Sequence, residues 1–153
     1  MPLYRFYRWT PIRRAVPEGL TMETSCGVVL VNFDSILLLQ YPQGHWDLPK
    51  GHVEVNDIDK QATARRELKE ETGIEGIVFV NGFEHRTTYS FRHKGQLIEK
   101  EVWWYIAETE TIKIELSPEH QQYIWLDWDR AIEQVTHDEA RAVLNAAREH
   151  FES

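Results

Sequence analysis

The sequence predicts a single compact domain of the α/β class. Segments with the pattern of strands alternate with a few helical segments along the 153 residues, and no linker, repeat or low-complexity stretch separates them. This length matches one typical domain and can bury a sizeable core. Hydrophobic residues make up 42% of the chain and aromatic residues 12%, a composition that excludes a disordered chain.

The first elements predicted are a β-hairpin and a helix. Two apolar runs, at 25–33 and 36–41, flank turn-forming residues at 32–35, which is typical of a hairpin. A helix is predicted over 58–72, because Gly73 is placed to cap its C-terminus.

Four strands and two helices are predicted beyond Gly73. The final helix has the clearest pattern, because Thr136 and Glu139 are spaced as a capping box and apolar residues then recur at the helical period up to Phe151. The other elements are strands at 77–83, at 87–92 and 99–107 about a turn at 93–95, and at 123–126, followed by a short helix over 127–135.

An acidic cluster near the end of the first helix is the most informative feature for function. Glu67, Glu70 and Glu71 are spaced i, i+3 and i+4, so they lie on one helix face. The C-terminal end of a helix disfavours each anion by roughly 0.3–1 kcal/mol, before mutual repulsion is counted. A hard cation resolves this conflict, because Mg²⁺ takes carboxylate oxygens and keeps positions open for water and phosphates.

The stretch from Gly51 to Ile74 resembles the Nudix box, in which a glycine leads to a glutamate and then to R-E-U-x-E-E-x-G-U, with U aliphatic. Residues 66–74 match every specified position of the second half. The resemblance implies an α/β/α sandwich with a mixed β-sheet and a pyrophosphohydrolase. It also implies that the Gly51 carbonyl and the three glutamates hold one to three Mg²⁺ ions, with Mn²⁺ as a possible substitute.

The first half of the box departs from the pattern by one extra residue between Gly51 and Arg66. An insertion inside the helix would rotate the later side chains by about 100°. We therefore place it in the loop before residue 58. Asp57 then takes the acidic place, which is the position of the leading glutamate of the box. This position is near the helix N-terminus, where an anion is favoured.

Two further segments, 44–52 and 116–126, resemble the matching stretches of asymmetric diadenosine tetraphosphate hydrolases. The resemblance implies that His45 and Lys50 contact substrate phosphates, although His45 is also compatible with an ordinary loop histidine. It implies that Tyr89 and Tyr123 stack on adenine, although packing at the core or its rim is the default for tyrosines on strands.

Lys94, Glu119 and Glu101 complete the candidate residues. Lys94 lies in the predicted turn at 93–95, within reach of a polyphosphate or simply in solvent. The segment of Glu119 resembles the loop that supplies an additional metal-binding carboxylate in related Nudix enzymes. Glu101 is the alternative, although an exposed strand face explains it equally well.

The expected mechanism is direct attack of water on phosphorus. Arg66, four residues before Glu70, orients that carboxylate, and Glu67 or Glu119 accepts the proton of the attacking water. A dinucleoside tetraphosphate would give a nucleoside triphosphate and a monophosphate. RNA 5′-ends, nucleoside triphosphates and nucleotide sugars are alternative substrates, and a nucleotide-sensing regulatory module is an alternative of another class.

Charge and cysteine content restrict location and partners. A net charge of −8 argues against general nucleic-acid binding, an RNA 5′ end excepted. Cys26, the single cysteine, lies in an apolar run, which favours a buried side chain and a reducing compartment. With no transmembrane or signal segment, we expect a cytoplasmic monomer or homodimer. Residues 1–20 are predicted as an arm or extra edge strand, and 21–153 as one domain.

Overall fold

The computed structural model describes residues 20–153, so the arm expected at the N-terminus lies outside the described residues apart from Leu20. Within this range the chain forms eight strands and three helices. In chain order they are β1 (Leu20–Asn32), β2 (Ser35–Gln40), β3 (Trp46–Asp47), β4 (Lys50–His52), α1 (Lys60–Thr72), β5 (Val78–Phe79), β6 (His85–His93), β7 (Gln96–Glu108), β8 (Gln122–Asp127), α2 (Trp128–Gln134) and α3 (Asp138–Glu152).

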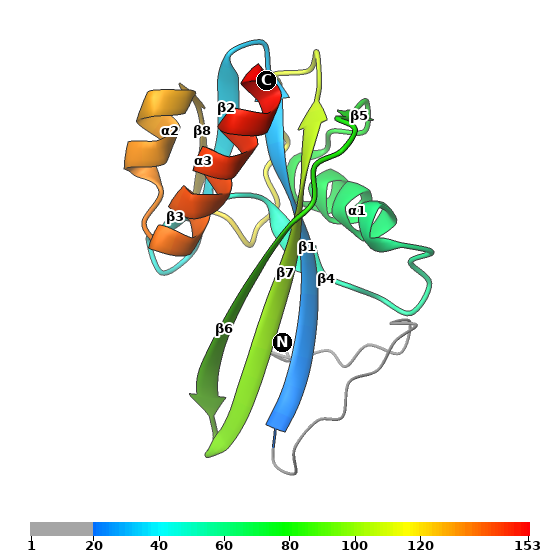
Figure 1. Cartoon of the computed structure of the whole chain (residues 1–153), viewed down its shortest axis with the longest axis vertical. Helices are drawn as coiled ribbons and strands as arrows, with labels where there is room; N and C mark the ends of the chain where they lie inside the picture. Colours follow the sequence, from blue (N-terminus) through cyan, green and yellow to red (C-terminus); the bar gives the residue numbers. More distant parts are fainter. Residues whose placement is uncertain (1–19) are drawn as a thin grey trace.

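A mixed sheet lies between two helical layers, with α1 on one face and α2 and α3 on the other (Figure 1). β1 pairs in parallel with β7 over almost its whole length, and the other strand pairs are antiparallel. The expected α/β/α sandwich is therefore confirmed. Beyond the helices, β1, β6 and β7 extend together as a long ribbon of three strands (Figure 1).

The alternating side chains of β1 divide the core into two parts. Val29 and Val31 pack in the cluster that contains residues of α2 and α3, whereas Val28 and Leu30 pack in the cluster that contains residues of α1. This alternation is the one expected of a strand buried on both faces. Cys26 is fully buried on the α1 side, and burial raises the pKa of its thiol. The prediction of a buried cysteine is confirmed.

The strand predicted over 77–83 is shorter, because only Val78–Phe79 forms β5. Gly82 has a φ of 83°, a left-handed conformation in which glycine is the favoured residue. The chain turns there, and β6 then pairs with β7 further along the same strand. Two very short strands, β3 and β4, were not predicted, since two or three residues are too few to show a periodic pattern.

The capping box predicted for the last helix is wrong. Helix α3 begins at Asp138 after His137, and no side chain caps its N-terminus. Thr136 instead bonds to β3: its Oγ1 accepts a hydrogen bond from the backbone N–H of Trp46 at 2.9 Å, and its own N–H donates to the Trp46 carbonyl at 3.1 Å. The Thr136 side chain, which the local pattern assigned to a helix cap, therefore makes a tertiary contact instead.

The box helix α1 begins two residues later than predicted. Asp59 caps it by accepting a hydrogen bond from the Ala62 N–H at 2.7 Å, as N-cap carboxylates do. Gly73 ends it with a φ of 78° and donates to the Lys69 carbonyl at 2.8 Å, which confirms the predicted C-cap. No helix described between residues 20 and 153 is long and apolar enough to cross a membrane.

Candidate active site

The acidic face of α1 turns toward β4. Glu67 and Glu71 are each only 8% exposed, whereas the side chain of Glu70 is 56% exposed. Gly51 in β4 lies against Glu67, because a Cβ at Gly51 would overlap the Glu67 carboxylate. The predicted carboxylates and the glycine therefore share one place in the fold. The spacing along the helix accounts for the grouping of the carboxylates.

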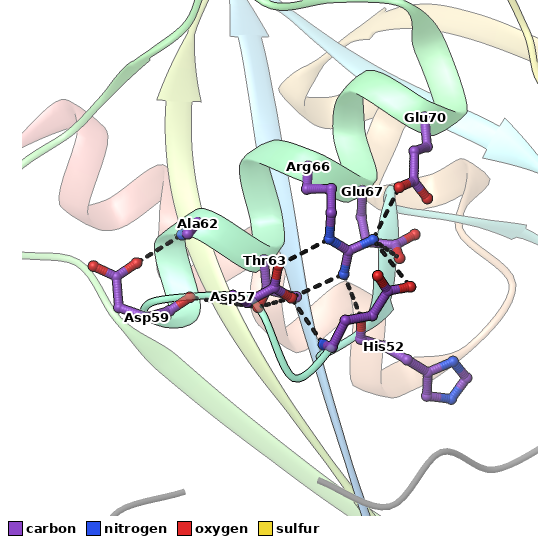
Figure 2. A network of polar contacts seen from close by, with 9 residues as sticks. His52, Asp57, Asp59, Ala62, Thr63, Arg66, Glu67 and Glu70 are labelled. Atoms are coloured by element: carbon purple, nitrogen blue, oxygen red, sulfur yellow. Dashed lines mark hydrogen bonds and ion pairs between the residues drawn. The ribbon is translucent and has the colours of Figure 1, made fainter. Parts of the chain in front are cut away.

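Arg66 connects four carboxylates and one carbonyl (Figure 2). Its Nη1 donates to Glu67 Oε2 at 2.9 Å and to Glu70 Oε2 at 3.0 Å. The same nitrogen lies 3.6 Å from Glu54, and Nη2 donates to the His52 carbonyl at 2.8 Å. Arg66 thus contacts Glu70 as expected, and it also joins the box helix to the preceding loop.

Asp57 is the fourth carboxylate on this arginine. Its two oxygens accept from Arg66 Nε and Nη2, each at 2.9 Å, a bidentate geometry that is strong and directional. Thr63 Oγ1 and the Glu54 N–H donate to the same carboxylate, both at 2.8 Å. Burial raises the pKa of Asp57, but these hydrogen bonds outweigh it and hold the pKa below its usual value.

The loop before α1 contains the turn that positions Asp57. The Asp57 N–H donates to the Glu54 carbonyl at 2.9 Å, which closes a turn over residues 54–57. α1 itself is regular from Lys60 to Thr72. This geometry agrees with the expectation that the extra residue of the box lies in the loop and that Asp57 takes the acidic place.

Glu71 has the properties of a carboxylate that needs a cation. Its Oε1 is buried without a hydrogen-bond partner, and such an atom is costly to bury unpaired. Burial is the largest cause that raises its pKa, followed by the charge of Glu67, while Lys50 lowers it by its charge and a backbone hydrogen bond. An oxygen donor with these surroundings fits a bound divalent cation.

As the side chains stand, Arg66 holds Glu67 and Glu70. Among the residues described by the structure, no group of three or more His, Cys, Asp or Glu side chains is gathered closely enough to hold a metal ion.

The segment that carries Glu119 packs on the C-terminal end of α1. Ser117 donates its N–H to the Glu71 carbonyl at 3.0 Å, and the charge of the exposed Glu119 contributes to the raised pKa of Glu71. Glu101 has other partners, because it accepts from Thr24 Oγ1 at 2.8 Å and from Arg86 Nε at 2.7 Å. The geometry therefore favours Glu119 over Glu101 as the additional carboxylate.

His45 and Lys50 meet at the half-buried ring of Tyr41. His45 stacks on this ring with the centroids 4.9 Å apart, and Lys50 Nζ lies 4.7 Å from its centroid. Tyr41 donates its hydroxyl to the Leu48 carbonyl at 3.1 Å. Burial lowers the pKa of His45, which favours its neutral form. Sequence reasoning missed Tyr41, since one aromatic at a strand end carries no distinctive signal.

Tyr89 lies on β6 directly opposite Lys100 of β7, so the two side chains share one face of the sheet. Lys100 was also missed, because only strand register places it there. Its pKa is lowered to about 8, first by burial and then by the charge of Lys50. The charge of Lys50 is therefore felt at Lys100.

The two predicted tyrosines are not core residues, since Tyr89 is 39% exposed and Tyr123 42% exposed. Tyr123 lies on β8 opposite Leu39 of β2. Lys94 has a φ of 51° in the turn between β6 and β7, at the far end of the ribbon from α1 (Figure 1). The structure therefore does not bring Lys94 to the glutamates.

The fold and the acidic helix define a hydrolase of pyrophosphate bonds, and comparison with known proteins agrees. The model of the NUDIX domain matches residues 22–146. The chain therefore belongs to the Nudix hydrolase family, whose enzymes generally use divalent metal ions such as Mg²⁺.

Several relatives indicate which kinds of Nudix enzyme this chain is similar to. The asymmetrical bis(5′-nucleosyl)-tetraphosphatase of Rattus norvegicus is 40% identical over 114 residues, which cover 71% of this chain and 74% of the relative. The RNA pyrophosphohydrolase of Caulobacter vibrioides is 32% identical over 121 residues, which cover 68% of this chain and 69% of the relative. The crystal structure of a C. elegans Ap4A hydrolase binary complex aligns with a TM-score of 0.70 and 27% identity, over 85% of this chain and 98% of that one.

Proposed function

We propose that this Nudix hydrolase cleaves a dinucleoside polyphosphate such as diadenosine tetraphosphate (Ap4A) asymmetrically, to a nucleoside triphosphate and a monophosphate. The carrying observation is the position of the acidic face of α1 beside Tyr41, His45 and Lys50. The charge and backbone of Lys50 act on the pKa of Glu71, and its ammonium lies beside the Tyr41 ring. The similarity to tetraphosphatases of this specificity supports the choice of substrate.

Mg²⁺, with Mn²⁺ as a substitute, is the cofactor we propose. The unpaired Glu71 Oε1 and the all-oxygen donor set fit it. Glu67, Glu70 and Glu71 would hold the metal, together with the Gly51 carbonyl and Glu119. When bound, the metal supplies Lewis acidity at the phosphate and lowers the pKa of a coordinated water.

The residues of the chain then have separate roles. Arg66 keeps Glu67 and Glu70 in place through the contacts in Figure 2. Glu67 or Glu119 accepts the proton of the attacking water as its oxygen bonds to phosphorus and the bridging P–O bond breaks. The leaving phosphate takes the electron pair of that bond.

On the substrate side, cations and aromatic rings match a polyphosphate with a base at its end. Lys50 binds phosphate oxygens, Lys100 adds a second positive charge, and His45 donates a hydrogen bond. The exposed rings of Tyr89 and Tyr123 stack on the base.

A panel of nucleotides with Mg²⁺ and product chromatography tests this function. Ap4A should give ATP and AMP in equal amounts, faster than ATP, ADP-ribose or a nucleotide sugar are cleaved. Glu70→Gln should lower turnover by at least about a hundredfold, because it removes a charge that acts on the developing anion. Glu75→Gln is the matched control, since Glu75 lies just after the helix and its carboxylate pairs with exposed Lys69. Two ADP molecules per Ap4A, or full activity of Glu70→Gln, would contradict the proposal.

A second substrate has a specific observation in its favour. The chain is 32% identical to an RNA pyrophosphohydrolase over 121 residues, and the Ser117-Pro118-Glu119 segment is compatible with that activity. An RNA with a 5′-triphosphate therefore belongs in the panel. Release of pyrophosphate from it faster than AMP from Ap4A would make RNA the better substrate.

A further inference from the structure

Asp47 in β3 is fixed through both of its carboxylate oxygens. Oδ2 lies 3.0 Å from Lys50 Nζ, and Oδ1 accepts a hydrogen bond from the Leu48 backbone N–H at 2.7 Å. The side chains of Lys50 and Asp47 are only 15% and 13% exposed. An ion pair shielded in this way is less screened by salt and more firmly held than one on the surface.

Lys50 is consequently held from two sides. An ammonium group has three N–H donors; one meets Asp47, and the charge also lies 4.7 Å from the Tyr41 ring centroid. A lysine normally loses rotamer freedom when it binds an anion. Here that freedom is restricted before any ligand arrives, which leaves a donor available in a defined position.

The charge of Asp47 also acts on the other groups of the substrate side. Burial has the largest effect, lowering the pKa values of His45 and Lys100 and raising that of Tyr89. The negative charge of Asp47 opposes the lowering in the first two and adds to the rise in Tyr89. These residues come from the loop before β3, from β6 and from β7. The charge of Asp47 is therefore felt at three further groups of the substrate side besides Lys50.

We propose that Asp47 is a positioning residue, which holds the Lys50 ammonium in the geometry that binds a substrate phosphate. The proposal rests on the function proposed above for Lys50. It assigns Asp47 an indirect role, because its negative charge would repel a phosphate at its own oxygens. Its effect on binding must then pass through Lys50.

Asp47→Asn tests the role with little change in shape. The amide oxygen still accepts from the Leu48 N–H, but the negative charge beside Lys50 is lost. We expect KM for the nucleotide that the panel identifies to rise about tenfold with kcat within about twofold, the sign of lost ground-state binding. The melting temperature should change little.

A double-mutant cycle separates positioning from a direct contact. Lys50→Met should raise KM further, and Asp47→Asn/Lys50→Met should match Lys50→Met alone, because the lysine through which Asp47 acts is gone. Asp129→Asn is the matched control, since Asp129 pairs with Arg148 at 2.7 Å on the α2–α3 surface. This substitution also removes an ion pair, but away from the site, and should leave KM unchanged.

Three outcomes would overturn the proposal. A normal KM for Asp47→Asn would show that Lys50 needs no partner, and a lower KM would make Asp47 a competitor of the phosphate. An equal effect of Asp47→Asn in the Lys50→Met background would place its action elsewhere.

If no nucleotide of the panel is cleaved, the proposed function fails instead. Calorimetry with inorganic tripolyphosphate then decides the role of Asp47, with weaker binding to Asp47→Asn expected and equal binding contradicting it.

Discussion

The carboxylate of Glu67 occupies the space that a side chain on Gly51 would need. The glycine of the box and its first helical glutamate are therefore matched in shape as well as in sequence spacing. The match arises because β4 pairs with β1 beneath α1, which places Gly51 opposite Cys26 on the face that the helix covers.

Gly51→Ala should displace Glu67 and lower turnover by about a hundredfold or more. A displaced carboxylate is expected to cost as much as the removal of an electrostatic group from an active site. The added methyl should also lower the free energy of unfolding by about 1–3 kcal/mol, as overpacking does. Gly76→Ala is the matched control, because a Cβ there meets nothing within 4 Å. Steady-state kinetics and thermal melts measure both effects, and normal turnover of Gly51→Ala would contradict the prediction.

Arg66→Lys should be far from conservative. An ammonium cannot reproduce the planar fork that bonds Asp57 through two nitrogens while it also reaches Glu67 and Glu70. We expect turnover to fall at least about tenfold and the free energy of unfolding to fall by about 1–3 kcal/mol, from buried acceptors left without donors. Arg65→Lys, on the exposed side of the same helix over Phe79, should change neither quantity. Equal behaviour of the two variants in kinetics and denaturant titrations would refute the role of Arg66.

Tyr123→Ala should raise KM for a dinucleoside polyphosphate about tenfold with kcat little changed, because base stacking is worth on the order of 1–3 kcal/mol per base. Tyr123→Phe should be nearly neutral, since the ring face does the stacking. The ring is 42% exposed, so the alanine variant should keep its melting temperature. A clear drop in melting temperature with an unchanged KM would remove Tyr123 from the site.

Acid should weaken the contact between the loop and the helix. Burial raises the pKa of Asp57, yet hydrogen bonds from Arg66, the Glu54 backbone and Thr63 bring it below the usual value. The stability that this carboxylate contributes is therefore complete above its unfolded pKa of about 4. It is lost as pH falls through the lower folded value. Urea midpoints measured between pH 6 and pH 2 should fall less steeply in Asp57→Asn than in the unsubstituted protein. Parallel curves would contradict the prediction.

Local patterns were sufficient for the parts of the site that lie on one element. The spacing of Glu67, Glu70 and Glu71 and the cap at Gly73 follow from helix geometry alone, and α1 confirms both. The place of Asp57 was predicted from the spacing of the box, but the contacts that hold it, with Arg66 and Thr63, join the loop to the helix.

Contacts between elements could not be predicted in the same way. Lys100 lies opposite Tyr89 only through the register of β7 with β6, whereas Lys94 was chosen for its turn and lies far from the glutamates. Strands of two or three residues such as β3 carry too few positions for a periodic signal. Tyr41 was missed for a related reason, since its value lies in what packs against its ring.

The pair of hydrogen bonds between Thr136 and Trp46 has a mechanical consequence. Trp46 stands between His45 and Asp47, so the start of α3 is tied to the strand that follows His45 and contains Asp47. A shift of α3, caused by a substitution on the surface or by a protein bound there, would pull on that strand from the opposite layer of the sandwich. Affinity for the nucleotide can therefore drift through changes in the α2–α3 connection while every glutamate of the box stays in place.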